Sequence, residues 1–167
     1  MKILVIHGPN LDLLGHRDPA HYGSTSLSEL DEHLESAGTK LGAEVTCRQS
    51  AREGVLVEWI HEALPESHGG QGAFDAVVVN PGGYAHTSVA LRDAVTVAVE
   101  AGLPVVEVHL SNVHGRETFR QQLLTGAAAS GVITGFGDTS YVLGLEAAVR
   151  LTNRTPEEET AADDSHQ

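Results

Sequence analysis

The segment VVVNPGGYAHTSVALRD, residues 77–93, carries the strongest structural pattern in the chain. Its three consecutive valines are apolar and β-branched, and so short a run is typical of a central strand buried on both faces. The strand should end at the NPGG sequence of residues 80–83, because proline donates no backbone hydrogen bond and glycine adopts angles closed to other residues. Thr87 or the serine after it can then cap a helix. We therefore expect Asn80 and His86 at the carboxyl edge of a strand, where open α/β sheets bind their ligands.

The same alternation of apolar strands and amphipathic helices continues on both sides of this segment. The pattern predicts further strands at residues 2–6, 44–49, 104–108 and 131–135, and further helices at residues 26–41, 53–64, 116–123 and 140–151. Five strands that alternate with helices imply an α/β fold with a doubly wound parallel sheet and right-handed crossovers. We expect the flavodoxin-like strand order 2-1-3-4-5, which puts the first and third strands side by side.

Composition limits the possible partners and the compartment. The 167-residue chain has a formal net charge of −13, which argues against nucleic acid or an anionic membrane surface as a partner. Its one cysteine, Cys47, cannot form an intrachain disulfide, which fits a reducing cytoplasm. The chain starts directly with a short apolar strand, so a signal peptide or membrane span is not supported. We expect one cytoplasmic domain at residues 1–151 and an acidic, disordered tail at residues 152–167.

Several familiar catalytic motifs are absent from the sequence. There is no GxxxxGK[ST] loop, no GxGxxG after the first strand and no GxSxG elbow. A phosphoacceptor receiver domain needs acidic residues where this chain has His7 and Asn80. The lysines are Lys2 and Lys40, at the start of a strand and on a helix surface, which makes a Schiff base improbable. Histidines suggest a metal site, yet the chain has no HExxH motif and no cysteine pair, so we expect neither metal nor cofactor.

Acid–base chemistry on a small anion is the function class that remains. Glu107 and His109 are two residues apart at the end of a predicted strand, so both side chains should lie on one face. A carboxylate in that place can orient the imidazole and favour its protonated form, which suits a general acid or base. A purely structural Glu–His pair is the alternative. Ser111 follows directly and could bind a carboxylate.

The polar, glycine-bounded segment 11–26 is long for a connector and is more typical of a functional lid. It carries Arg17 and Tyr22. Ionising half of a tyrosine at pH 7 requires lowering its pKa by about 3 units, or roughly 4 kcal/mol. One guanidinium at ~4 Å supplies about that much at an effective dielectric constant near 20. Tyr22 could therefore act as a base.

A second pair of cationic residues lies on the predicted helix at 116–123. Arg116 and Arg120 are four residues apart, so they share one helix face, and each could be either solvated or in the pocket.

Four sequence blocks together resemble one family, type II 3-dehydroquinate dehydratase. The blocks are HGPNL at 7–11, RDPAHYG at 17–23, NPGGYAHTS at 80–88 and EVHLSNVH at 107–114. The resemblance extends from about residue 2 to residue 151, without the loop at 66–72 and the tail. It implies a flavodoxin-like lyase that needs no metal or cofactor and converts 3-dehydroquinate to 3-dehydroshikimate in the shikimate pathway of aromatic amino acid biosynthesis. It also implies a homo-oligomer in which trimers assemble into a dodecamer.

The same resemblance implies a role for each matching residue. Tyr22 is similar to the base that removes a proton beside the ketone, with Arg17 stabilising its phenolate. Asn10 is similar to the asparagine that holds a water molecule against the enolate, and His109 to the acid that protonates the leaving hydroxyl, oriented by Glu107. The implied substrate contacts are Asn80, His86 and Arg120 for hydroxyl groups, the Leu110 and Ser111 amides for the carboxylate, and Asp93 in the site of a neighbouring subunit.

The chain departs from the family pattern in a few places. His7 stands where asparagine is common, the loop at 66–72 is longer than usual, and His21 lies beside Tyr22. Two rival functions stay open. One is a non-catalytic flavodoxin-like module that binds a small hydroxy-carboxylate, and the other is an enzyme of the same fold that acts on a related hydroxy acid.

Overall fold

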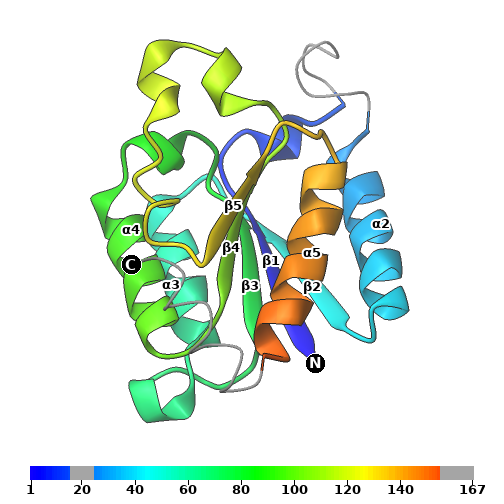
Figure 1. Ribbon diagram of the computed structural model, residues 1–167, viewed down its shortest axis with the longest axis vertical. Helices are drawn as coiled ribbons and strands as arrows, with labels where there is room; N and C mark the ends of the chain where they lie inside the picture. Colours follow the sequence, from blue (N-terminus) through cyan, green and yellow to red (C-terminus); the bar gives the residue numbers. More distant parts are fainter. Residues whose placement is uncertain (16–24, 155–167) are drawn as a thin grey trace.

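The strand order follows the prediction, in a computed structural model that describes residues 1–15 and 25–154. The sheet in this part of the chain is parallel and has the order β2-β1-β3-β4-β5 (Figure 1). Its strands are β1 (Lys2–His7), β2 (Glu44–Gln49), β3 (Ala76–Asn80), β4 (Val105–His109) and β5 (Gly131–Thr134). The first and third strands are therefore neighbours, and His7 pairs with Asn80 at their carboxyl ends.

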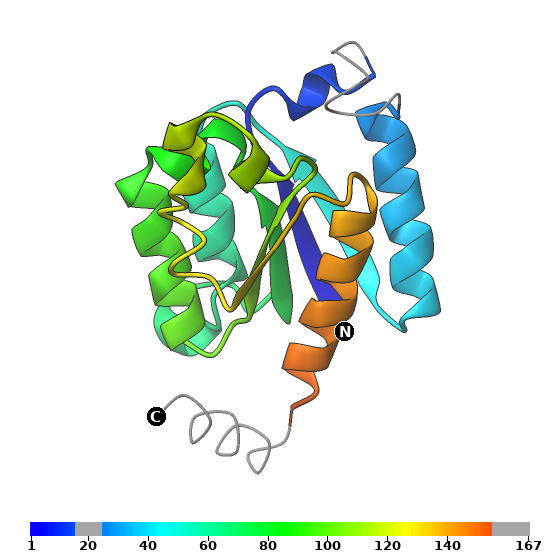
Figure 2. The ribbon, with the colours of Figure 1, turned by 45° about the horizontal axis from the view of Figure 1, so that its top comes forward.

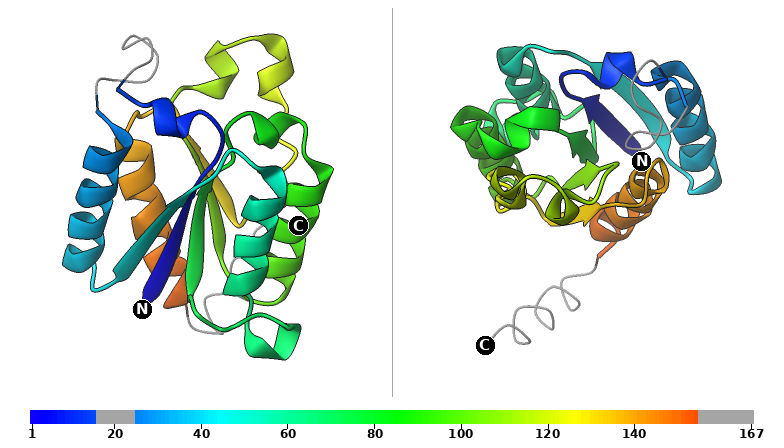
Figure 3. Two further views of the ribbon diagram at one scale, coloured as in Figure 1. Left: turned by 180° about the vertical axis from the view of Figure 1, so that it is seen from behind. Right: turned by 90° about the horizontal axis from the view of Figure 1, so that it is seen from above.

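Helices cover both faces of the sheet, and this explains the apolar character of the central strands. The helices are α2 (Leu27–Lys40), α3 (Glu53–Ala63), α4 (Val89–Glu100) and α5 (Thr139–Thr152). On one face, Ile3 and Val5 of β1 pack with residues of α2 and α5. On the other face, Leu4 and Ile6 pack with residues of α3 and α4, as the two views of Figure 3 show for the helix layers. Residues 3–7 of β1 and all residues of β3 and β4 are thus buried, whereas the edge strands β2 and β5 are mostly half-buried.

Serine caps start two of these helices. Ser26 accepts a hydrogen bond from the Glu29 amide through its hydroxyl, and the Glu29 carboxylate accepts one from the Ser26 amide, which forms a capping box. Ser88 caps α4 by accepting a hydrogen bond from the Leu91 amide at 2.8 Å. The sequence left Thr87 or Ser88 as the cap of α4, and the structure selects Ser88.

The predicted helix at residues 116–123 is wrong. The structure has two 3₁₀ segments there, η4 (Val113–Gly115) and η5 (Thr118–Gln121), separated by extended backbone at Arg116 and Glu117. No residue of η5 is buried, and Phe119 is 63% exposed. Because so short a segment gains little from local hydrogen bonds, it needs a packed apolar face to form an α-helix, and it lacks one here.

Two of the predicted segments fall outside the described residues. They are the central part of the proposed lid, residues 16–24, and residues 155–167 of the proposed tail. Within the described ranges, none of the helices combines the length and the apolar character needed to cross a membrane.

The carboxyl ends of β1 and β3 lie in direct contact, and glycine makes this contact possible. The Gly8 amide donates to the Asn80 carbonyl at 2.8 Å, and a Cβ atom at Gly8 would lie 2.6 Å from the Pro81 carbonyl oxygen. Gly82 has a φ of 59° and faces the Pro9 carbonyl. Figure 2 brings this end of the sheet forward, where η1 (Leu11–Leu13) and η3 (Gly82–His86) follow the two strands.

Gly8→Ala should destabilise the fold by about 1–3 kcal/mol, because the new methyl group would meet the Pro81 carbonyl rather than a movable side chain. Gly83→Ala is the matched control, since a Cβ there meets nothing within 4 Å. Urea denaturation of the two variants and the unmodified chain measures the difference. Equal stability of both variants would show that the two strand ends are not held as close as the structure indicates.

Candidate active site

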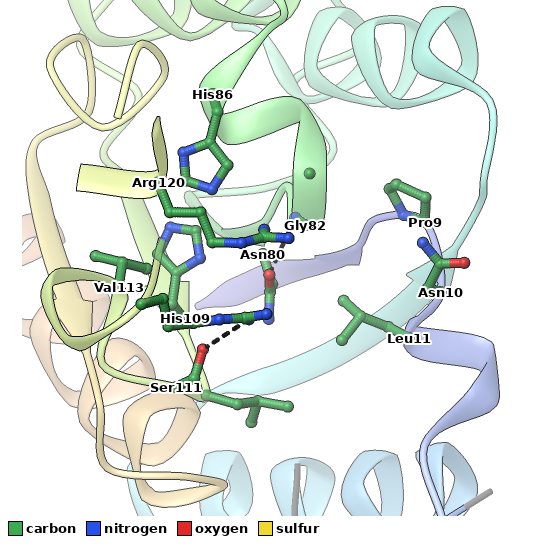
Figure 4. Close-up of a pocket in the computed structure, with 13 residues that line it drawn as sticks. Pro9, Asn10, Leu11, Asn80, Gly82, His86, His109, Ser111, Val113 and Arg120 are labelled. Carbon is green, nitrogen blue, oxygen red and sulfur yellow. Dashed lines mark hydrogen bonds between the residues drawn. The ribbon is translucent and has the colours of Figure 1, made fainter. Parts of the chain in front are cut away.

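A pocket lies at the carboxyl ends of β1, β3 and β4, where the sequence predicted a ligand site. Its volume is about 130 Å³, well below the roughly 300–1,000 Å³ typical of sites for drug-sized molecules, so it suits a small ligand. Figure 4 shows how its side chains converge from the strand ends and from the 3₁₀ segments that follow them. The lining residues are Pro9, Asn10, Leu11, Asn80, Gly82, Gly83, His86, His109, Leu110, Ser111, Val113, Arg116 and Arg120.

Most residues predicted for the site line this pocket. They are Asn10, Asn80, His86, His109, Leu110, Ser111 and Arg120. Glu107 does not line it but contacts His109 from below the surface. Asp93 lies on α4 outside the pocket, with its side chain 65% exposed and 3.5 Å from Arg92. Arg17 and Tyr22 lie outside the described residues.

The Glu107–His109 pair is the most deeply buried ionisable feature of the pocket. The imidazole Nε2 and the carboxylate Oε1 are 2.7 Å apart, and Glu107 is fully buried while His109 is 6% exposed. An ionised carboxylate only accepts hydrogen bonds, so Nε2 carries the proton and Nδ1 is left for a ligand in the pocket. Such an arrangement holds the ring in one orientation and one tautomer, as general acid–base catalysis requires.

Asn10 and Asn80 both line the pocket, Asn10 from the turn after β1 and Asn80 from the end of β3. Asn10 has a φ of 67°, and it is the one non-glycine residue with positive φ in the described ranges. Asparagine tolerates this left-handed conformation better than most residues, which explains an asparagine at this turn. The Asn80 side-chain oxygen accepts a hydrogen bond from the Gly82 amide at 3.1 Å, which fixes the amide group at the mouth of the turn.

The opposite wall is built by His86 and by the two 3₁₀ segments. His86 Nδ1 lies 2.9 Å from the Gln122 carbonyl oxygen. Because a carbonyl cannot donate, His86 donates from Nδ1 and keeps Nε2 as the atom that can serve a ligand. The Arg120 guanidinium lies 5.0 Å from the Phe119 ring centroid and donates to Glu117 at 2.8 Å, so two neighbours hold it in place.

Arg116 is a pocket residue that the sequence did not assign to the site. It was one of two arginines left as either solvated or facing the pocket, and the structure places both in the lining. Arg116 donates to the Ser111 hydroxyl at 3.3 Å. The Glu117 backbone amide and then Arg120 hold the pKa of the Glu117 carboxyl below its ordinary value, so this acidic group balances part of the positive charge. Because two arginines line the pocket, it suits an anionic ligand even though the protein as a whole is acidic.

A buried polar network behind the pocket was not predicted from the sequence. The Tyr141 hydroxyl lies 2.8 Å from His7 Nδ1 and also hydrogen-bonds the Asn80 side chain. His7 and Tyr141 are both fully buried, and burial raises the pKa of the Tyr141 phenol far above its ordinary value. The polar His7 in an otherwise apolar strand was the available clue, but its partner lies 134 residues away in the sequence.

The fold and the pocket together define a doubly wound α/β protein with a buried Glu–His pair beside a small pocket whose lining includes two arginines. The chain belongs to the dehydroquinase class II family, whose model matches residues 1–149. It is 47% identical over 154 residues to a 3-dehydroquinate dehydratase from Desulforudis audaxviator. This match covers 92% of this chain and 96% of the relative. The type II dehydroquinase structure from Butyrivibrio crossotus aligns with a TM-score of 0.81 at 37% identity, over 89% of this chain and 97% of that one.

A second solved structure agrees with this assignment. The type II dehydroquinase from Propionibacterium acnes has a TM-score of 0.80 and 36% identity, and covers 89% of this chain and 96% of its own length. Family, sequence relatives and structures therefore point to the same class of enzyme.

Tyr141→Phe should cost about 1–3 kcal/mol of stability, because it leaves buried polar groups of His7 and Asn80 without their shared partner. Tyr84→Phe is the matched control. The Tyr84 hydroxyl donates to the Ala51 carbonyl at an exposed position, where water can replace it, so a change within about 0.5 kcal/mol is expected. Denaturant unfolding of both variants decides the point, and a Tyr141→Phe protein as stable as the control would contradict the network.

Proposed function

We propose that this chain catalyses the dehydration of 3-dehydroquinate to 3-dehydroshikimate. The observation that carries the proposal is the buried Glu107–His109 pair, which opens onto a small pocket that also contains two arginines. This combination offers a proton donor together with a site for a carboxylate. The 3-dehydroquinate dehydratases among its relatives, which share about half of their residues with this chain, support the choice of substrate.

Removal of a proton from the carbon beside the ketone starts the reaction. We assign this step to Tyr22 as its phenolate, stabilised by Arg17. This assignment is chemically reasonable because a guanidinium at ~4 Å can lower the pKa of a phenol by about 3 units in a site that excludes water. That is the shift that half-ionisation at about pH 7 requires. The electron pair of the broken C–H bond forms the enolate. Asn10, at the edge of the pocket, holds a water molecule that hydrogen-bonds the enolate oxygen.

Departure of the hydroxyl group completes the elimination. The enolate electrons reform the ketone and the new carbon–carbon double bond, and the C–O bond breaks. His109 gives its Nδ1 proton to the leaving hydroxyl, which departs as water. Glu107 supports this step because its carboxylate, 2.7 Å from Nε2, fixes the orientation of the ring while Nδ1 serves the pocket.

The remaining pocket residues position the substrate. The Leu110 and Ser111 amides bind the carboxylate, and Arg116 adds positive charge next to Ser111. Asn80, His86 and Arg120 contact the hydroxyl groups. Asn80 and His86 are held by hydrogen bonds to the Gly82 amide and the Gln122 carbonyl, so both are pre-organised before the substrate arrives.

The finer assignments belong to the same proposal. We place the enzyme in the cytoplasm, in the shikimate pathway of aromatic amino acid biosynthesis, as a single domain of residues 1–151 with a disordered acidic tail. It assembles through trimers into a dodecamer. Asp93 supports this assembly, because its side chain on α4 is exposed and does not line its own pocket, so it is available to the site of a neighbouring subunit.

A direct assay tests the function. The purified chain with 3-dehydroquinate should give the ultraviolet absorbance of the conjugated enone, and quinate itself should give none. The rate should persist after incubation with borohydride, because neither lysine of the chain lies in the described pocket. It should also persist after EDTA treatment, because the proposed proton transfers use side chains and no metal ion. Binding of the substrate without enone formation would replace the proposal by a non-catalytic binding module. Inactivation by borohydride would indicate an imine mechanism.

His109→Ala and Tyr22→Phe should each lower kcat by about 10²–10⁴-fold, because each removes one of the two proton transfers. His114→Ala is the control for the loss of a histidine in the same loop, since His114 lies outside the pocket lining and should retain full activity. Steady-state kinetics at saturating substrate measures the effects. A Tyr22→Phe enzyme with near-normal kcat would remove Tyr22 as the base, and the same result for His109→Ala would remove His109 as the acid.

A further inference from the structure

A cluster of three different metal-binding side chains lies apart from the pocket. His7 at the end of β1, Cys47 on β2 and Asp31 on α2 each present one ligand atom, and the three atoms lie within 4.8 Å of one another. None of these residues lines the pocket. The cluster therefore joins two strands and a helix on the face of the sheet that α2 covers.

The orientation of His7 aims one ring nitrogen into this cluster. Its Nδ1 bonds the Tyr141 hydroxyl at 2.8 Å, which fixes the ring and leaves Nε2 toward Asp31. Nε2 lies 2.9 Å from the Asp31 Oδ1 atom, and His7 is fully buried. Despite this short distance, neither atom has a hydrogen-bond partner among the described residues. A buried nitrogen that meets a carboxylate outside hydrogen-bond geometry is unusual and needs an explanation.

We propose that His7, Asp31 and Cys47 form a binding site for one divalent transition-metal ion of the Zn²⁺ type. Imidazole nitrogen, carboxylate oxygen and thiolate sulfur are the three donor types that Zn²⁺ uses. Ligand atoms around a tetrahedral Zn²⁺ lie about 3.4–3.6 Å apart, given bond lengths of roughly 2.0–2.3 Å. The distances within the cluster, from 2.9 Å for His7–Asp31 up to a limit of 4.8 Å, bracket that value.

Coordination also explains the poor hydrogen-bond geometry. Two ligands of one ion approach each other from the side, because each points its lone pair at the metal rather than at the other ligand. His7 fits the usual pattern of a metal-binding histidine, whose second nitrogen is held by another polar group, here the Tyr141 hydroxyl. With three protein donors, the fourth position is left for water.

The electrostatic surroundings favour a cation at this place. Burial raises the pKa of the Cys47 thiol most, and the charge of Asp31, a hydrogen bond to Asp31 and, more weakly, the charge of Glu35 raise it further. Glu35 lies one helical turn beyond Asp31 on α2. Asp31 and Glu35 therefore bring negative charge to the cluster, which attracts a cation, and the thiol would give up its proton when the metal binds.

Metal titration of the full chain tests the site. Zn²⁺ should bind with one equivalent in calorimetry, and Co²⁺ should give the intense charge-transfer absorption of a thiolate ligand. Because the ion would join β1, β2 and α2 in the folded state, the Tm should rise with metal concentration. Cys47→Ser and Asp31→Asn should each weaken Zn²⁺ binding by roughly 100-fold or more, since even residues around the ligands contribute about 10–100-fold.

His33→Gln is the matched control, because His33 is an exposed histidine on the same helix and should leave affinity and stoichiometry unchanged. Circular dichroism and urea unfolding of the metal-free variants confirm that Cys47→Ser and Asp31→Asn fold. Unchanged Zn²⁺ affinity in both variants, or Co²⁺ binding without a thiolate band, would overturn the proposal and leave a buried His–Asp contact. Enone formation from 3-dehydroquinate in EDTA-treated protein is an independent readout, so failure of the metal site leaves the proposed function untouched.

Discussion

The close contact between the carboxyl ends of β1 and β3 is the constraint on which the site depends. Gly8 touches the Pro81 carbonyl and Gly82 faces the Pro9 carbonyl, so no side chain separates the two turns. Neighbouring parallel strands whose connections leave to opposite faces open a crevice at this point. Because the turns meet directly, Asn10 and Asn80 reach the same small pocket from two different strands. A bulkier residue at Gly8 would push the turns apart and change the shape of the pocket.

The second requirement is a pocket that holds positive charge within an acidic molecule. The formal net charge of −13 would repel an anionic substrate at long range, yet Arg116 and Arg120 both line the pocket. Interactions between exposed charges fall off over about 8 Å at physiological ionic strength, so these local arginines dominate at contact distance. Glu117, held ionised by its own backbone amide and by Arg120, keeps one guanidinium in place.

The polar interior behind the pocket connects chemistry to the fold. Asn80 lines the pocket and also bonds Tyr141, which bonds His7, which in turn faces Asp31 at the surface of α2. A buried polar group is costly unless it is paired, so each member fixes the next. This chain of contacts ties the α2–α5 layer to the catalytic edge of the sheet. It also gives the buried His7 a specific structural partner, the Tyr141 hydroxyl.

The sequence determined what depends on neighbours along the chain. Apolar runs such as Val77–Val79 indicated buried strands, the NPGG turn marked the ligand edge, and the two-residue spacing of Glu107 and His109 placed them on one face, as their 2.7 Å contact confirms. Only the tertiary structure decided the rest. It replaced the helix expected at 116–123 by 3₁₀ segments that put Arg116 in the pocket. It also brought His7 together with Asp31, Cys47 and Tyr141. These outcomes depend on packing between residues far apart in the chain, and no local pattern encodes such contacts.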